Sequence, residues 1–239
     1  LTAAAQGDAG AVARHLESRE RLRLMSAVDE HNRGPAHLAA RGGHTEVLRT
    51  LFDHGADLET GDRFGRTPLH LACEYGQSKA AMLMLDCGSE PAKEDRSGRT
   101  ALHLAACSED SSMVQILASQ YPHLVGKVDS HCRTPLFYAA LNVHAQAQEH
   151  ATDMLIQCLA EVNARDLYGR TPLHHAAEER RRIAVQLLLR HRGNPHAADA
   201  VGGRTPLELA GSDAVRAELR RAAQSGGEPG GAPPRTSGQ

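Results

Sequence analysis

Apolar residues recur along this chain at helical spacing, in short groups separated by polar turns. Val47, Leu48, Leu51 and Phe52 occupy positions i, i+1, i+4 and i+5, which predicts an amphipathic helix. The run 185–189, with Val185, Leu187, Leu188 and Leu189, predicts a matching helix further along the chain. Each such helix has one apolar face that only a neighbouring element can cover, so the pattern predicts helices that stack.

A threonine-proline step divides the chain into units of nearly constant length. Its anchor positions are Gly34, Thr67, Thr100, Thr134, Thr171 and Thr205. The successive spacings are 33, 33, 34, 37 and 34 residues, and the hexapeptide GRTPLH occurs unchanged at 65–70 and 169–174. A period of this length indicates a repeat architecture in which each unit packs on its neighbours.

The Thr-Pro-Leu-His sequence has the features of a helix start. Thr is a favoured N-cap, and Pro suits the first helical position because its missing N–H would be unpaired there. The histidine falls at the third helical position, from which a side chain can reach back to the cap. We therefore interpret His70, His103 and His174 as capping residues rather than catalysts, and Glu208 takes their position in the last copy.

Asp-x-x-Gly turns precede the caps at 62–65, 95–98 and 166–169. The aspartate is a hydrogen-bond acceptor and the glycine can adopt a positive φ, which together predict a tight hairpin. Asn32 and Cys132 stand where the turn glycine is expected. Asn tolerates left-handed geometry, whereas Cys132 should either be strained or adopt another turn.

Four segments share one heptapeptide pattern, TPLHLAC at 67–73, TALHLAA at 100–106, TPLFYAA at 134–140 and TPLHHAA at 171–177. Together with HGADLE at 54–59 and AEVNARD at 160–166, they make the chain similar to the ankyrin repeat family. The resemblance implies an all-α fold, an ankyrin-repeat solenoid of stacked helix-turn-helix units with projecting β-hairpin fingers.

The resemblance implies about seven repeats within residues 1–223. The expected units are a degenerate N-terminal repeat at 1–28, then 29–61, 62–94, 95–128, 129–165, 166–198 and a C-terminal capping repeat at 199–223. The Gly- and Pro-rich residues 224–239 are expected to form a disordered tail.

The unit at 129–165 is the least regular. Phe137 replaces the cap histidine, and about four additional residues lie within 142–153, between the two expected helices. A longer first helix and a protruding loop are both compatible with the sequence. A tolerated surface insertion and a partner-specific contact are the two interpretations of its role.

Composition narrows the possible functions. The formal net charge of -2 gives no general basis for nucleic-acid binding, and no apolar run approaches the roughly 20 residues that span a bilayer, so we expect neither partner. The five cysteines include no CxxC pair, and we expect reduced thiols in a cytosolic or nuclear protein.

Clusters of histidine and cysteine, such as His70 with Cys73, follow from the repeat pattern and lack the four converging ligands of a zinc site. The chain has no phosphate-binding loop and no nucleophile paired with an oriented base. We expect no metal, no cofactor and no enzymatic activity.

The family resemblance places partner binding at the finger tips and first helices, which line a concave face. The expected partner-binding residues are Arg63, Phe64, Arg66, Tyr75, Arg96, Arg99, His131, Arg133, Leu167, Tyr168 and Arg170. The aromatic residues among them can anchor an interface or, alternatively, pack on a neighbouring finger.

One position holds arginine in six successive units. These residues are Arg33, Arg66, Arg99, Arg133, Arg170 and Arg204. A row of guanidinium groups can grip an acidic segment of a partner by bidentate pairing. The alternative is that each arginine pairs with a nearby Asp or Glu of its own chain.

Two further features suggest modification or targeting. LIQCLAEVN at 155–163 resembles the hairpin sequence of ankyrin repeats that an asparaginyl hydroxylase modifies, with Asn163 as the candidate acceptor. EERRR at 178–182 is interpreted as a solvated charged turn, with a nuclear-import or phosphate-contacting patch as the alternative.

The leading functional hypothesis is a monomeric, non-enzymatic scaffold or adaptor that binds another protein, in the cytoplasm, the nucleus or both. A second hypothesis is a targeting or regulatory domain of a larger enzyme or channel. A third follows from DRFGRTPLHLACEYG at 62–76, which is similar to the ankyrin domains of inhibitor-of-NF-kappa-B proteins and suggests transcriptional regulation. Notch ankyrin domains are a weaker resemblance of the same kind.

Overall fold

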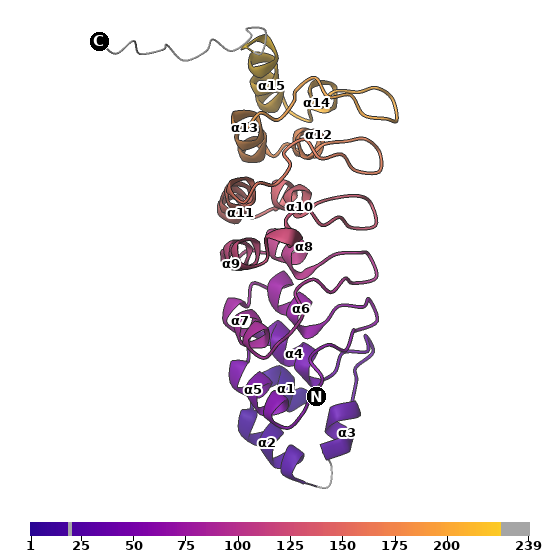
Figure 1. Cartoon of the computed structure of the whole chain (residues 1–239), viewed down its shortest axis with the longest axis vertical. Coiled ribbons are helices and arrows are strands. Elements are labelled where there is room, and N and C mark those ends of the chain that lie inside the picture. The colour runs from indigo at the N-terminus through magenta and orange to yellow at the C-terminus, as the bar shows by residue number, and fades with distance from the viewer. Residues whose placement is uncertain (19–20, 226–239) are drawn as a thin grey trace, which may run out of the picture.

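Helices stacked in two layers make up the chain (Figure 1). The computed structural model describes residues 1–18 and 21–225. The inner layer, next to the projecting loops, consists of α1 (Thr2–Gln6), α4 (Pro35–Gly42), α6 (Pro68–Glu74), α8 (Ala101–Ala106), α10 (Pro135–Leu141), α12 (Pro172–Glu178) and α14 (Pro206–Leu209). The outer layer consists of α2 (Ala9–Glu17), α5 (Thr45–Asp53), α7 (Ser78–Asp86), α9 (Ser112–Gln120), α11 (Ala145–Gln157), α13 (Arg182–Arg190) and α15 (Asp213–Ser225).

Two short helices lie outside this pairing. The 3-10 helix η1 (Pro122–Leu124) follows α9, and α3 (Arg21–Ser26) lies on the loop side of the first unit (Figure 1). The described residues contain no β-strand, which agrees with the all-α prediction.

The starts of four inner helices, α6, α8, α12 and α14, confirm the capping interpretation. In α6 the Thr67 Oγ1 accepts from the N–H of His70 at 3.4 Å, and the N–H of Thr67 donates to the His70 Nδ1 at 3.2 Å. The same reciprocal capping box is present at the N-termini of α8, α12 and α14. In α14 Glu208 takes the place of the histidine. In α10 the substitution of Phe137 leaves the buried hydroxyl of Thr134 without a partner.

The cap histidines also join neighbouring units, which the sequence did not predict. His70 Nε2 lies 3.1 Å from the carbonyl oxygen of Arg99 in the next unit. Because Nδ1 accepts the cap N–H, Nε2 carries the proton and donates to that carbonyl. His37, His103 and His174 make the equivalent bond at 3.0–3.1 Å. Both ring nitrogens are therefore occupied by backbone bonds within the fold.

The core is a continuous seam between the two layers rather than a central cluster. Val47, Leu48 and Leu51 are buried, while Phe52, at the edge of the same predicted face, is 40% exposed. Each unit buries its apolar face against the next one, so stability depends on stacking between neighbours.

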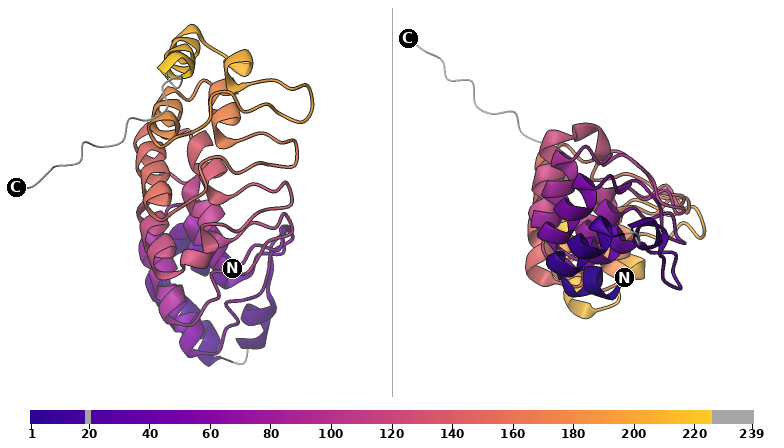
Figure 2. Two further views of the ribbon diagram at one scale, coloured as in Figure 1. Left: turned by 45° about the horizontal axis from the view of Figure 1, so that its top comes forward. Right: turned by 90° about the horizontal axis from the view of Figure 1, so that it is seen from below.

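The loops between units form a row of fingers on one side of the solenoid (Figure 2). Within the third unit the N–H of Asp62 donates to the carbonyl of Arg66, and the N–H of Gly65 donates to the carbonyl of Asp62. Gly65, Gly98 and Gly169 have φ of 77°, 74° and 72°, as predicted for the Asp-x-x-Gly turn. The fingers are thus hairpin-shaped turns without strand pairing inside them.

Backbone hydrogen bonds tie successive fingers together. In each case the residue after the finger aspartate donates to a carbonyl of the preceding finger. The pairs are Arg63 to His31, Arg96 to Phe64, Ser130 to Ser97, Leu167 to His131 and Ala200 to Tyr168, at 2.8–2.9 Å. The finger tips therefore form one ordered row.

The additional residues of the fifth unit lengthen its second helix, so both predicted forms of the insertion were wrong. α10 has seven residues, as α6 and α12 have, and no loop protrudes at 142–144. α11 has 13 residues, whereas α5, α7, α9 and α13 have nine. Four residues make about one helical turn, so the buried face of α11 keeps its direction along the added length.

Side-chain amides close the turn between α10 and α11. Gln148 Nε2 donates to the carbonyls of Ala140 and Asn142, at 2.8 and 2.9 Å. Asn142 Nδ2 donates to carbonyls at 106 and 108 in the preceding unit. These bonds replace the glycine turn that ends α6 at Gly76, where φ is 65°.

The two non-glycine finger turns are both left-handed. Asn32 has φ of 57° and Cys132 has φ of 60°. Of the two predicted outcomes for Cys132, the structure shows the strained one, because a side chain with a Cβ disfavours this region.

Leu159 combines backbone strain with exposure. Its φ is 65° and its side chain is 91% exposed, at the position after the second helix that Gly55 and Gly88 hold in earlier units. We expect Leu159→Gly to stabilise the domain by about 1 kcal/mol, because relief of left-handed strain exceeds the added entropy of the unfolded chain. Denaturant unfolding at equilibrium measures the change.

Val143→Gly is the matched control, because Val143 is 66% exposed and has no positive φ. That change should be neutral or destabilising. If both glycine variants shifted stability in the same direction, strain at Leu159 would not be the cause.

The C-terminal helix α15 ends at Ser225, so residues 224 and 225 are helical and not part of a tail. The remainder of the expected disordered tail, 226–239, lies outside the described residues. Within 1–18 and 21–225, no helix has the length and apolar character needed to cross a bilayer.

Candidate protein-binding surface

The arginine row is paired within the fold in the second to fourth units. Each guanidinium binds the aspartate that opens its own finger, and Arg66 also binds Glu74 at 2.8 Å. The pairs are Arg33 with Asp29 at 2.7 Å, Arg66 with Asp62 at 2.9 Å, and Arg99 with Asp95 at 2.7 Å. Burial alone would raise the pKa of Asp29, but hydrogen bonds from Arg33 lower it to about 2. The structure thus shows the internal pairing that was the alternative to partner binding.

In the fifth finger the arginine no longer pairs with the aspartate of its own finger but approaches the aspartate of the next finger. Here Tyr138 donates its hydroxyl to Asp129 Oδ2 at 2.7 Å, and so takes the place that arginine holds in earlier units. Arg133 instead lies with its Nε 3.8 Å from Asp166 Oδ2 in the sixth finger. Tyr138 therefore redirects an arginine from its own finger to the next one.

The sixth unit repeats this forward shift. His175 Nε2 lies 2.8 Å from Asp166 Oδ2, and Arg170 Nε lies 3.4 Å from Asp199 in the seventh finger. Arg204 Nε also approaches Asp199, at 3.5 Å. The sequence signal for the shift is a polar residue, Tyr138 or His175, at the helix position that holds leucine in the third and fourth units.

Two predicted tip residues carry charge that no carboxylate of the described chain neutralises. Arg63 and Arg96 are exposed and take part in none of the ion pairs among residues 1–18 and 21–225. The Arg63 guanidinium lies 4.7 Å from the ring centre of Phe64, and that of Arg66 lies 5.0 Å away. Phe64 remains 42% exposed between them, so cation-π contact orients the tip without covering it.

The other predicted aromatic residues differ in their surroundings. Tyr75, at the C-terminal end of α6, is 41% exposed, and its ring centre lies 4.8 Å from the guanidinium of Arg41. Tyr168 is 45% exposed at the sixth finger tip, beside Leu167 at 61%. His131 is exposed on the fifth finger, where its Nδ1 lies 3.2 Å from the hydroxyl of Ser130. The structure brings these tips into one row, whereas Tyr75 lies apart from them, at the C-terminal end of inner helix α6.

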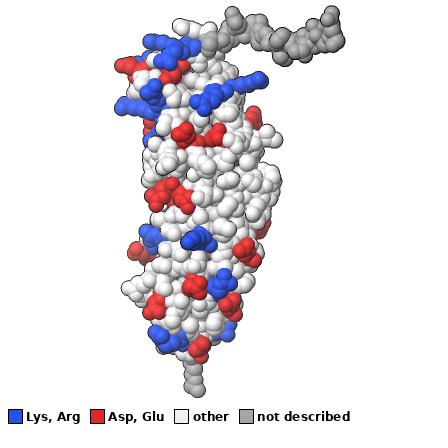
Figure 3. Space-filling view, turned by 90° about the vertical axis from the view of Figure 1, so that its left-hand side faces the viewer, with Lys and Arg blue, Asp and Glu red and all other residues white. Residues whose placement is uncertain are grey.

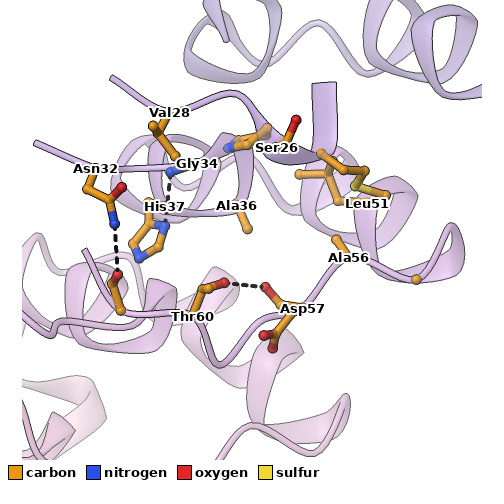
Figure 4. Close-up of a pocket in the computed structure, with 14 residues that line it drawn as sticks. Ser26, Val28, Asn32, Gly34, Ala36, His37, Leu51, Ala56, Asp57 and Thr60 are labelled. Atoms are coloured by element: carbon orange, nitrogen blue, oxygen red, sulfur yellow. Dashed lines mark hydrogen bonds between the residues drawn. The ribbon is translucent and has the colours of Figure 1, made fainter. Parts of the chain in front are cut away.

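A cavity of about 470 Å³ opens between α3, α4 and the loop after α5 (Figure 4). Polar side chains that line it already make hydrogen bonds within the protein. His37 Nδ1 accepts from the N–H of Gly34, and Asn32 Nδ2 donates to the carbonyl of Gly61. Thr60 donates its hydroxyl to the carbonyl of Asp57. No motif predicted this cavity, which arises where the irregular first unit meets the regular second one.

Two of the cysteines, Cys73 and Cys107, are largely shielded from water. Burial raises the pKa of Cys73 to about 12 and that of Cys107 to about 11, so these thiols are poor nucleophiles near neutral pH. Among the described residues, no three His, Cys, Asp or Glu side chains group in a way that could hold a metal ion.

The two remaining candidates have structural contacts. Asn163 Nδ2 donates to the carbonyl of Arg192 at 3.0 Å, and Asn163 Oδ1 accepts from the N–H of Asn194 at 2.8 Å. Its hydroxylation stays a prediction. In the EERRR segment, Arg182 pairs with Glu218 of α15 at 3.2 Å.

The outer face of the solenoid shows both signs of charge interspersed, with arginines gathered near α13 and α15 (Figure 3). Part of this group is neutralised, since Arg216 pairs with Asp213 and Arg221 pairs with Glu218. The outer face therefore lacks the uniform charge of a nucleic-acid surface.

The geometry is that of a helical repeat protein, with short-range stacking and a projecting finger in each unit. A sequence profile for ankyrin repeats in three copies matches residues 1–95 and 83–166, and one for ankyrin repeats in many copies matches residues 155–210. The chain belongs to the ankyrin repeat family, whose members generally act as protein-protein interaction modules.

Solved structures with the same fold include the ankyrin repeat domain of Bcl-3, described as a unique member of the IkappaB protein family. It is 28% identical with a TM-score of 0.72, and the match covers 92% of this chain and 96% of the chain in that structure. The human ASB11 ankyrin repeat domain is 22% identical with a TM-score of 0.77, covering 98% and 97%.

A third similar chain comes from the structure of a predatory endopeptidase from Bdellovibrio bacteriovorus in complex with an immunity protein. The matched chain is 23% identical with a TM-score of 0.67, and the match covers 79% of this chain and 95% of that one. At this identity the likeness concerns the fold.

Proposed function

We propose that this protein is a monomeric, non-enzymatic scaffold or adaptor that binds another protein through its finger tips and concave groove, in the cytoplasm, the nucleus or both. The observation that supports the proposal is the row of finger tips, where Arg63 and Arg96 make no ion pair with any described residue and Phe64 and Tyr168 are exposed. Arginine and aromatic residues are the types most enriched among energetically dominant interface residues.

The internal pairing of the arginine row changes which residues are proposed to bind. Arg66, Arg99, Arg133 and Arg170 hold the fingers in place, because each lies close to a finger aspartate. An acidic segment of a partner would bind the exposed tip arginines rather than the arginines of this row, which already lie close to aspartates. We assign the row a positioning role and the tips the contact role.

Site-specific photo-crosslinking tests this proposal. A photoreactive phenylalanine analogue at Tyr168 should capture a defined protein from cell extract. The same analogue at Gln115, exposed on outer helix α9, should capture that protein at least about tenfold less. Equal capture from both positions would contradict a tip-directed function.

A second candidate is a transcription-regulating role of the inhibitor-of-NF-kappa-B type. The 28% identity to the Bcl-3 ankyrin domain over nearly the whole of both chains favours it. Co-elution of the purified chain with purified NF-kappa-B dimers in size-exclusion chromatography tests it. A targeting or regulatory role within a larger enzyme or channel is compatible with the same surface.

A further inference from the structure

The finger tips present two side chains per unit in a regular order. The first follows the finger aspartate and the second follows that residue; we call the twelve positions the tip row. From the second unit to the seventh they are Glu30 and His31, Arg63 and Phe64, Arg96 and Ser97, Ser130 and His131, Leu167 and Tyr168, Ala200 and Val201.

The tip row changes chemistry along its length. Its third and fourth units carry exposed Arg63 and Arg96, which have no carboxylate partner within the described chain. Its sixth and seventh units carry only apolar or aromatic groups, with Leu167 61%, Tyr168 45% and Val201 65% exposed. Beyond exposed Glu30 in the second unit, the row is therefore basic in its third and fourth units and apolar in its sixth and seventh.

The stability of the fold requires neither the exposed arginines nor the exposed apolar residues of the tip row. The arginines that stabilise fingers occupy a different position and are paired there, so Arg63 and Arg96 are not needed for that purpose. The three exposed apolar groups lie on adjacent fingers that backbone bonds hold in order. Their exposure leaves apolar surface in water, which favours contact with a partner.

The spacing of the units limits the shape of that partner. Packed helices lie about 8 to 10 Å apart, and an extended chain advances about 3.3 Å per residue, so each unit corresponds to about three residues. Arg63 and Arg96 are one unit apart, and two units separate Arg96 from Tyr168. A further unit leads to Val201.

We propose that the tip row binds an extended segment of the partner protein with acidic residues at one end and apolar residues at the other. The segment carries two carboxylates about three residues apart and, about six residues further along, two apolar side chains about three residues apart. This proposal rests on the proposed function and adds the chemistry of the partner. A nucleic acid is disfavoured because four of the six units of the row carry no arginine or lysine at the tip.

Fluorescence anisotropy with labelled synthetic peptides tests the proposal. One peptide has two aspartates and two leucines in the stated pattern, a second has the pattern reversed, and a third has the same composition scrambled. One of the two patterned peptides should bind the purified chain at least about tenfold more tightly than the scrambled peptide. Equal affinities for all three would overturn the proposal.

Charge exchange identifies the site. The double variant Arg63→Glu, Arg96→Glu should bind the patterned peptide at least about tenfold more weakly and should bind a lysine-for-aspartate peptide more tightly than wild type does. Tyr168→Ser should weaken both interactions. The outer-face variant Arg190→Glu, Arg220→Glu is the matched control and should behave as wild type.

Three results would contradict the assignment: unchanged affinity in the tip variant, an equal loss in the outer-face control, or tighter binding of a 15-nucleotide single-stranded DNA than of the patterned peptide. If crosslinking from Tyr168 were selective but no patterned peptide bound more tightly than the scrambled one, only the proposed acidic and apolar pattern of the partner segment would be overturned. Unselective crosslinking would overturn the proposed function itself.

Discussion

Lowering the pH from 7.5 to 5.5 should destabilise the domain through its buried histidines. Five buried histidines, His37, His70, His103, His174 and His175, have pKa values below 6.5, mainly because burial disfavours the charged ring. In the cap histidines a second cause is geometric, because a proton on Nδ1 would face the cap N–H that this nitrogen accepts.

The direction of the change in stability with pH follows from proton uptake by the unfolded chain. Below pH 6.5 the unfolded chain binds protons that the folded chain excludes, so stability is complete above this pH and falls as the pH decreases. Each histidine contributes at most about 1.4 kcal/mol per pH unit, and five such groups set an upper limit of about 7 kcal/mol at pH 5.5. The finger aspartates Asp29, Asp62 and Asp129 have lowered pKa values and act in a separate window, below about pH 4.

Urea unfolding at a series of pH values, followed by circular dichroism, measures this effect. The triple variant His70→Gln, His103→Gln, His174→Gln supplies the control, because glutamine at the third helical position retains the capping box without titrating. It should lose about half of the pH dependence between 7.5 and 5.5. A triple variant with the wild-type slope would show that these histidines are not responsible.

Asp166→Ala should cost about 3 to 5 kcal/mol, among the largest effects of any single substitution in the fingers. Asp166 is 5% exposed and accepts from the N–H groups of Tyr168 and Arg170 through Oδ1. Its Oδ2 meets His175 at 2.8 Å and Arg133 at 3.8 Å. Removal of the carboxylate would leave His175 and two turn amides without their hydrogen-bond acceptor, and partly buried Arg133 without its nearest counter-charge.

Asp213→Ala tests whether the cost depends on burial. Asp213 pairs with Arg216 at 2.8 Å, but its side chain is 98% exposed, and surface pairs of this kind contribute little. Its urea midpoint should therefore match that of wild type. Equal midpoints for Asp166→Ala and wild type would mean that the sixth finger is held by its backbone bonds alone.

The sequence predicted the parts of this fold that depend on local rules. The caps at Thr67 and Thr205 follow from residues three positions apart, and the turns at Gly65 and Gly98 follow from backbone preference. Repetition of these rules at a nearly constant period was sufficient to predict the solenoid.

Other features depend on contacts between units, which no single repeat specifies. The second bond of His70 requires a carbonyl 29 residues away, and the redirection of Arg133 requires both Tyr138 and Asp166. For the candidate site, the sequence could not separate arginines that pair with finger aspartates, such as Arg66, from those that face solvent, such as Arg63. The exposure of each arginine side chain and its distance from the nearest carboxylate distinguish the two groups.

The one-turn extension of α11 implies a rule for how this domain can change in length. An insertion of two residues would rotate the following face of the helix by about 200° and turn Ala151, Thr152 and Leu155 away from the core. Insertions of about four, seven or eleven residues nearly restore the face. Outer helices of such a domain can therefore vary only in near-whole turns, which lets a single unit broaden the outer face while the inner layer and its fingers keep their positions.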